Sequence, residues 1–527
     1  MTLTFGSLLA IAAFLVFWVQ PLVARMILPV LGGSPGVWNT CVFFFQTTLL
    51  LGYLYAHFLT RLKFSRQRIL HGAALTVALI LAPNTQSAWT SNRYGAEALD
   101  ILLGLTSYIG VPFIVLSSSA PLLQHWYSLS RTERAADPFF LYAASNAGSL
   151  LALLIFPTLL EQFLPLTDQI AYWFYMVLGF SITVAILSLI LPTTVAKTTG
   201  QPSATFAVQD RWQAATWVGT AFVPSSLMLS VTTHITTDIA AVSFLWIVPL
   251  AIFLSTYILA FSGIGKAAAS VARLALPLSI LGLWVVLLQG RNETLVQIPI
   301  DLGIVACVSM LLHHQLFQAR PEAERLTSFY ICIAIGGLFG GLFNSIVAPT
   351  LFDSVLEFEL VLGIGVLVVN WNLINETVCR FRNADWRGLG LRDVGLIIFA
   401  AFAFAVIGLE FNDASKTLLV TAMVACSAIG CAYIVGVRGA GQLIATLSAA
   451  LFLSMSMVTK STHGLFAERS FFGALTVDEI VVEGRLFRRL IHGTTIHGIQ
   501  SQEAGEAMSL QSYYAPMGPV IASYTRD

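Results

Sequence analysis

Residues 3–24 read LTFGSLLAIAAFLVFWVQPLVA and contain no charged side chain. An α-helix needs about 20 consecutive, mainly apolar residues to cross the hydrocarbon core of a bilayer. This run therefore predicts a membrane-spanning first helix. It has no positive charge before it and no small-residue cleavage site after it, so we expect a retained helix and not a removed signal peptide.

The rest of the chain has the same apolar character. Soluble domains contain about 25% charged residues, whereas this chain of 527 residues contains 10% and is 57% hydrophobic. We therefore expect lipid to surround most of it. Its 27 basic and 27 acidic residues balance, which gives no electrostatic indication of nucleic-acid binding.

The same length criterion, applied along the chain, predicts an all-α polytopic membrane bundle. The third and twelfth apolar runs are short, so we expect about fourteen or fifteen spans. The expected spans lie near 3–24, 37–60, 69–83, 98–118, 138–160, 169–193, 214–234, 238–262, 272–289, 297–318, 327–351, 357–371, 394–410, 416–436 and 440–457.

Lysine and arginine collect in every second loop, and this pattern marks the cytoplasmic side of a membrane protein. The alternation predicts a cytoplasmic N-terminus. The intervening loops carry acids instead, namely Glu161, Asp168, Asp353 and Glu357. The basic loop residues are Arg61, Lys63, Arg66, Arg68, Arg131, Arg134, Arg320, Arg325, Arg380, Arg382, Arg387 and Arg392.

A weak internal repeat divides the bundle. PTLLE at 157–161 resembles PTLFD at 349–353, and residues 17–21 resemble 222–224, both at offsets of about 200 residues or roughly six helices. The alternative is chance similarity between apolar segments. We predict a first six-helix half at 1–193, a second at 214–371, additional helices at 394–457 and a tail at 458–527. Two parallel halves with a substrate site between them characterise major-facilitator-type transporters.

Ionisable side chains inside the predicted spans are the first candidates for a functional site, because they usually face a cavity or another helix. His234 and Asp238 are four residues apart and share one face of a helix. Asp238 could hold a cation or a proton, or could instead cap the following helix. Asp301 is a second candidate partner for a cation. Arg25 is expected at the end of the first helix, where it could snorkel in a structural role or bind a ligand.

Small and polar residues cluster in three predicted helices. SSS at 117–119, SNAGS at 145–149 and the glycine pairs of 336–341 favour close helix packing and interhelical hydrogen bonds. Asn146 is the substrate-binding candidate within them. His313 and His314 have no evident third ligand, and the six cysteines form no CxxC pair, so we predict no metal site.

The apolar character stops at residue 458. Alternating, aromatic and β-branched residues predict strands at 469–477, 485–490 and 494–499, and thus a small β-sheet. No βαβ unit and no glycine-rich nucleotide loop follows it.

Motifs in a fixed order give the chain a family resemblance. They are Gln20-Pro21, Gly32-Gly33-Ser34-Pro35, Trp38-Asn39, Phe45-Gln46, GYLYAH at 52–57, Ser145-Asn146, PSSLM at 224–228, TDIA at 237–240, ERSFFG at 468–473, HGTT at 492–495 and Tyr513-Tyr514. With these the chain resembles bacterial inner-membrane proteins in which a major-facilitator-like bundle is fused to a spermidine-synthase-like domain. The resemblance implies that the tail is the opening β-domain of an aminopropyltransferase-like module, with Gln500 and Tyr514 at the positions that hold nucleoside and amine substrates.

The resemblance also implies what the tail lacks. The family's nucleotide loop, its catalytic acids and its pocket for decarboxylated S-adenosylmethionine lie beyond the segment that Gln500 and Tyr514 match, so we expect no cofactor in this chain. Fifteen spans and a cytoplasmic N-terminus would place the tail outside, where nucleoside cofactors are not expected. Fourteen spans would place it in the cytoplasm.

Three functions follow from these features. The first is a transporter-like protein for a polyamine or similar small cationic metabolite, with Asp238 and Asp301 as cation partners. The second is an aminopropyltransferase-like enzyme whose catalytic half is missing, either encoded separately or lost. The third is a scaffold that presents the strand-rich tail to another protein, because unpaired strand edges invite pairing.

Overall fold

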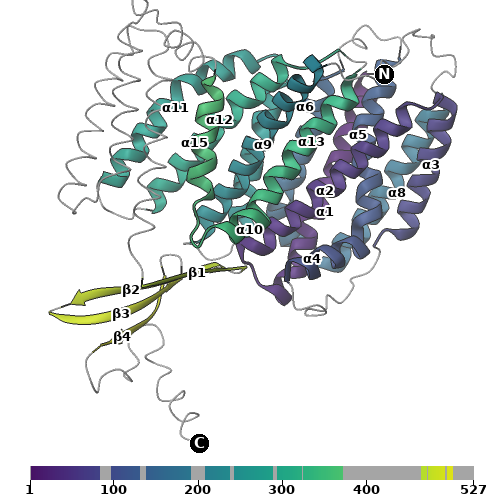
Figure 1. The fold of residues 1–527 in the computed structure, drawn as a ribbon. Helices are drawn as coiled ribbons and strands as arrows, with labels where there is room; N and C mark the ends of the chain where they lie inside the picture. The colour runs from purple at the N-terminus through teal and green to yellow at the C-terminus, as the bar shows by residue number, and fades with distance from the viewer. Residues whose placement is uncertain are drawn as a thin grey trace, which may run out of the picture.

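The computed structural model describes residues 2–83, 97–130, 138–190, 208–237, 243–288, 294–322, 325–371, 465–471, 473–482, 484–492 and 495–502. Within these ranges the chain forms a helical bundle and a separate four-stranded sheet (Figure 1). The helices before residue 191 are α1 Thr2–Leu31, α2 Pro35–Thr60, α3 Phe64–Leu81, α4 Glu97–Leu105, η1 Thr106–Gly110, α5 Val111–Ser128, α6 Phe140–Ile155, η2 Phe156–Leu160, α7 Glu161–Phe163 and α8 Leu166–Ile190. Those after residue 207 are α9 Val208–Thr237, α10 Ser243–Ala260, α11 Gly265–Leu288, α12 Thr294–Gln318, α13 Leu326–Leu342, η4 Phe343–Val347, α14 Ala348–Leu351 and α15 Glu357–Val369.

These helices confirm the predicted membrane bundle. Eight helical runs among the described residues are long and apolar enough to cross a bilayer, and the shorter apolar helix Trp246–Ala260 accompanies them. Each expected span from 3–24 to 357–371 overlaps a helical run, and the largest difference is at 98–118, whose run continues to Ser128. The spans expected at 394–410, 416–436 and 440–457 lie outside the described residues.

The first helix is longer than the sequence predicted. It continues past Arg25 to Leu31, although Pro21 and Pro29 lie inside it. Membrane helices tolerate proline because neighbouring helices and local adjustments satisfy the freed backbone groups. Arg25 therefore lies more than a turn before the helix end and is half-buried, so its expected place at the helix terminus is wrong.

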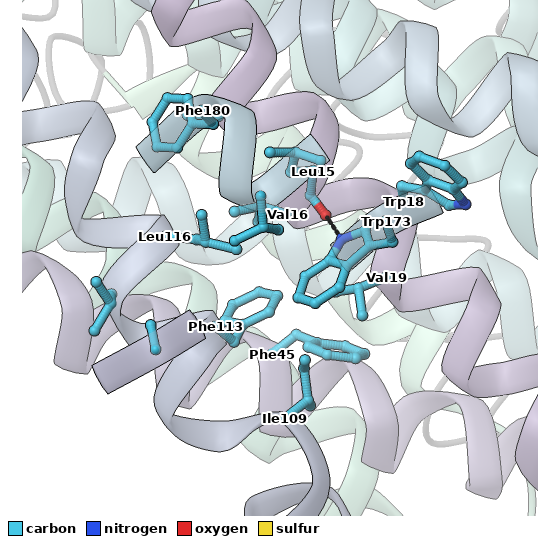
Figure 2. Close-up of a cluster of buried hydrophobic side chains, with 14 of the residues drawn as sticks. Leu15, Val16, Trp18, Val19, Phe45, Ile109, Phe113, Leu116, Trp173 and Phe180 are labelled. Atoms are coloured by element: carbon cyan, nitrogen blue, oxygen red, sulfur yellow. Dashed lines mark hydrogen bonds between the residues drawn. The ribbon is translucent and has the colours of Figure 1, made fainter. Parts of the chain in front are cut away.

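The described bundle has two large cores, one for each run of helices, and a smaller cluster in which Trp38 and Leu153 of the first run pack with Met228 and Trp246 of the second. The first core contains only buried residues between Phe5 and Leu187, and the second is built almost wholly from residues between Trp217 and Val366. Figure 2 shows part of the first core, where the Trp173 indole lies against α1 and donates a hydrogen bond of 2.9 Å to the carbonyl oxygen of Leu15. The two cores agree with the predicted two-half arrangement.

The helix pairs in the two cores correspond. In the first half α1 packs along α6, and in the second half α9 packs along α13. A π-helical turn interrupts the fifth helical run of each half. The turn η2 contains most of the PTLLE motif, whereas η4 ends just before the PTLFD motif. Both motifs thus lie at the C-terminal end of the fifth run.

Glycines allow the close approach of these paired helices, as the small-residue clusters predicted. A Cβ on Gly148 would collide with the carbonyl oxygen of Ala10 on α1, and a Cβ on Gly336 would meet the carbonyl oxygen of Val218 on α9. This close approach brings the two helix backbones into direct van der Waals contact. In lipid, such packing drives helix association, because no hydrophobic driving force acts between helices there.

Replacing Gly148 with alanine is expected to destabilise the bundle by about 1–3 kcal/mol, the typical cost of overpacking. The matched control is Gly179→Ala on α8, where nothing lies within 4 Å of an added Cβ. That control should be neutral or stabilising by about 0.5–1 kcal/mol, since glycine weakens a helix interior. Thermal unfolding in detergent measures both variants, and equal effects would contradict the packing assignment.

The tail is an antiparallel meander of β1 Phe466–Ser470, β2 Gly473–Val482, β3 Arg485–His492 and β4 Thr495–Ser501. The single strand predicted at 469–477 is two strands, because the chain reverses between the paired residues Ser470 and Gly473. Gly473 has φ of 154°, and a Cβ there would collide with the His492 ring. Glycine tolerates such a backbone and lets the hairpin close.

The sheet lies at the end of the bundle opposite the N-terminus (Figure 1). Arg469 of β1 donates hydrogen bonds of 2.7 and 2.9 Å to the two carboxylate oxygens of Glu357 and one of 3.0 Å to the carbonyl oxygen of Ser354. Glu357, expected in an acidic loop, is fully buried.

Candidate functional site

A cavity of about 160 Å³ lies between the two halves of the bundle. We call it the central cavity. Helices α1, α2, α5 and α6 of the first half and α9, α10 and α13 of the second half all contribute to its wall. Its polar wall groups come from Gln20, Gln46, Tyr53, Ser117, Tyr142, Ser145, Asn146, Ser149, Ser225 and Tyr257. A cavity at the junction of two repeats is the usual place for a transporter's substrate.

Aromatic rings form one side of this cavity. Tyr142 stacks on Tyr330 with ring centroids 5.1 Å apart and meets the edge of Tyr257 at 5.4 Å. Phe253 packs against Tyr257 at 5.2 Å. Among the described wall residues none carries a formal charge. The wall therefore offers π faces, hydroxyls and amides, the mixture that small-molecule sites commonly present.

The Gln46 amide has a fixed orientation. Its Nε2 donates to Ser225 Oγ at 2.9 Å, and that hydroxyl donates in turn to the carbonyl oxygen of Gly337 at 3.2 Å. Because the hydroxyl proton is already used, Ser225 must accept from Gln46. The Oε1 atom of Gln46 is thus an acceptor, buried and without a hydrogen-bond partner among the described residues. Buried polar atoms are normally paired.

Contacts between the halves lie toward both ends of the cavity. Toward the N-terminal end, Tyr330 donates to Gln124 Oε1 at 2.7 Å. At the end that meets the sheet, Asn39 Nδ2 donates to Thr233 Oγ1 at 3.0 Å, and Trp38 stacks on Trp246 with centroids 5.3 Å apart.

A buried carboxylate lies elsewhere in the second half. Asp301 on α12 is 1% exposed, and neither of its oxygens has a hydrogen-bond partner among the described residues. His234 on α9 holds its Nε2 atom 3.6 Å from Asp301 Oδ2 and packs on the Phe358 ring at 4.9 Å. The separation exceeds ordinary hydrogen-bond length, so a proton or a small shift would complete the pair.

The predicted site residues are distributed over several places. Asn146 lines the central cavity and donates to the carbonyl oxygen of Tyr142 at 2.8 Å. His234 meets Asp301, while Arg25 lines neither described cavity. Gln500 is exposed on β4. Asp238 and Tyr514 lie outside the described residues.

Several residues of the site were missed from the sequence as site candidates. Gln46, Tyr142 and Tyr257 look like ordinary members of apolar helices, and only the packing of the halves shows which face meets the cavity. Gln20, the one polar side chain in the middle of the first span, was the available signal. Glu357 and Arg469 are far apart in the sequence, and no sequence pattern indicated that they form a pair.

No family model matches the sequence, and no curated protein matches it. Among solved structures, the fold is similar to the major facilitator superfamily proton:xylose symporter XylE, with 14% identity and a TM-score of 0.43 over 70% of this chain and 95% of that one. A nucleoside transporter, NupG, aligns with 11% identity and a TM-score of 0.42 over 69% of this chain and 98% of that one. A double-tryptophan variant of XylE aligns with 12% identity and a TM-score of 0.42. At such values the function must be inferred from the chain's own residues.

Proposed function

We propose that this membrane protein is a transporter that moves a small amine through the central cavity. The observation that carries the proposal is a partly polar cavity whose wall is shared between two helical halves. Relative movement of two halves about a fixed site is how such folds expose a solute to each side in turn.

The wall chemistry supports a donor-rich solute. The Gln46 Oε1 atom is an unfilled acceptor, and the tyrosine faces can attract an ammonium group. No charged side chain of either sign lines the described wall, so a carboxylate or phosphate would be buried without a counter-charge at high cost, whereas an ammonium group would have the Gln46 oxygen and the tyrosine faces to interact with. A polyamine or similar small cationic metabolite fits this chemistry. An uncharged polyol is the alternative solute, and the uptake experiment below distinguishes it from an amine.

The buried pair of His234 and Asp301 supports coupling to protons. A carboxylate inside a membrane bundle is costly unless a proton or a cation neutralises it. Asp301 has both oxygens without hydrogen-bond partners among the described residues, with one imidazole 3.6 Å away. We propose that this pair gains and loses a proton as the amine moves.

Uptake of radiolabelled putrescine into proteoliposomes tests the proposal. The variant Gln20→Leu removes an amide from the cavity wall. Within the part of the chain that the structure describes, this amide makes one long hydrogen bond, of 3.4 Å, to the carbonyl oxygen of Val16. Uptake should fall about tenfold, the loss of one charge-assisted hydrogen bond. The control is Gln162→Leu, an exposed glutamine outside the cavity, which should keep normal uptake.

The outcomes separate the solutes. Uptake of putrescine, blocked by unlabelled putrescine and not by glycerol, supports an amine. Competition by glycerol alone would replace the amine with a polyol. Absence of uptake of either compound would remove the transport proposal.

The resemblance of the tail to an aminopropyltransferase domain remains a prediction. Its substrate candidates Gln500 and Tyr514 are, respectively, exposed on β4 and outside the described residues. The described sheet favours a structural role, because Arg469 holds β1 on the bundle through Glu357. We therefore assign transport to the bundle and no catalysis to the sheet.

A further inference from the structure

A second cavity, of about 70 Å³, lies where the sheet meets the bundle. We call it the junction pocket. Its bundle side contains Asn39 of α2, Thr233 and Thr236 of α9, and Asn344 of η4, and its sheet side contains Arg469 and His492. Residues of both halves and of the tail thus meet in one small enclosure.

The junction pocket and the central cavity lie along the same three helices. Residues seven or eight apart on a helix share one face and are about 10–12 Å apart along its axis. On α2, α9 and α13–η4 respectively, the pairs that line the two cavities are Asn39 and Gln46, Thr233 and Ser225, and Asn344 and Gly337. The two cavities are therefore stacked along the boundary between the halves.

Hydrogen bonds fix the orientation of both asparagines. Asn344 Nδ2 donates to Ser226 Oγ at 2.7 Å and to the carbonyl oxygen of Gly340 at 2.8 Å. Asn39 Nδ2 donates to Thr233 Oγ1, a hydroxyl that itself donates to the carbonyl oxygen of Leu229 at 3.2 Å. In each amide the hydrogen bonds thus identify the nitrogen atom, and the other atom, Oδ1, is a hydrogen-bond acceptor.

Neither of these acceptors has a hydrogen-bond partner in the part of the chain that the structure describes. Asn39 is 3% exposed and Asn344 1% exposed. Buried polar atoms without a partner call for an explanation such as a ligand. Arg469 is the one lysine or arginine among the described pocket residues. Its guanidinium lies 2.7 Å from the Glu357 carboxylate, so its charge is already neutralised and does not favour an anion in the pocket.

We propose that the junction pocket is a second binding site, which takes a hydrogen-bond-donating group, an ammonium or a hydroxyl, at the Oδ1 atoms of Asn39 and Asn344. Binding there stands independently of transport. Its role as the next station for a solute leaving the central cavity rests on the proposed function. The π-helical turn η4 that carries Asn344 is a feature common at functional sites.

Protection of a thiol at the pocket mouth tests the site. In a chain whose six cysteines are replaced by alanine, Ser470→Cys places a thiol at an exposed position that lines the pocket. Ethanolamine is the probe, and ethylene glycol is its uncharged counterpart. Both should slow labelling of this thiol by a maleimide. If ethanolamine protects the thiol and ethylene glycol does not, the site binds an ammonium group. If both compounds protect it, the site also accepts a hydroxyl group.

Variants of the acceptors decide the result. Asn39→Leu and Asn344→Leu, each checked for folding by thermal unfolding, should raise the half-protecting ethanolamine concentration about tenfold, the loss expected for one hydrogen bond to a charged donor. Asp353→Cys, exposed on the bundle end beside Ser354, is the matched control and should label at an unchanged rate. Protection that is absent in the unsubstituted pocket, or unchanged in both leucine variants, would overturn the site. Neither readout requires uptake, so failed transport leaves this test intact.

Discussion

Glu357→Gln is expected to lower the stability of the docked sheet by about 3–5 kcal/mol, because it leaves the Arg469 guanidinium buried without a counter-charge. The pair is enclosed, with side-chain exposures of 6% for Arg469 and 0% for Glu357. The guanidinium binds both carboxylate oxygens, a geometry that arginine supports through its planar fork. Thermal unfolding and the rate of proteolysis of the tail measure the loss.

An exposed ion pair in the same sheet provides the control. Arg488 Nε lies 3.0 Å from Glu479 Oε1, with side-chain exposures of 48% and 31%. Exposed pairs contribute about 0–1 kcal/mol, so Glu479→Gln should change little. The double variant Glu357→Gln with Arg469→Gln should lose less than the two single variants together, since no charge is then left unpaired. Equal destabilisation by Glu357→Gln and Glu479→Gln would show that the buried pair does not hold the sheet.

Local sequence patterns were enough to predict the helices. The length of apolar runs located the spans, because each helix satisfies its own backbone in lipid and needs no distant partner. The errors arose where contacts between residues far apart in the sequence determine the local structure. Glu357 looked like a loop acid because Arg469 is more than a hundred residues away, and the strand expected at 469–477 is divided by a hairpin whose Gly473 packs against His492.

The candidate site was harder to predict for the same reason. His234 was paired with Asp238 by helical spacing, which is a local rule, yet the described carboxylate near its ring is Asp301 of α12. Asn146 was found because a polar cluster in an apolar helix is conspicuous, whereas Gln46 depends on a hydroxyl of the other half. Which helix faces meet is set by packing between halves, and a single sequence carries little information on it.

Asp301→Asn is expected to abolish accumulation of putrescine driven by a pH gradient while leaving exchange of labelled for unlabelled putrescine in place. The amide keeps the shape of the side chain but cannot bind and release a proton. Proton movement down the gradient can then no longer drive putrescine movement. Without a pH gradient the variant and the unsubstituted protein should therefore equilibrate putrescine at similar rates. Flux measurements in proteoliposomes, with and without an imposed gradient, separate the two behaviours.

Stability gives a second, independent readout of the same substitution. Asp301 is buried, and neither of its oxygens has a hydrogen-bond partner among the described residues; an unsatisfied buried polar group costs about 1–3 kcal/mol. Replacing the carboxylate with a neutral amide should therefore maintain or raise the unfolding temperature, so a loss of accumulation cannot be attributed to misfolding. Asp353→Asn, at an exposed position, is the matched control and should leave gradient-driven accumulation intact. Accumulation by Asp301→Asn that equals that of the unsubstituted protein would remove Asp301 from the coupling site, because a side chain that never titrates cannot carry the proton.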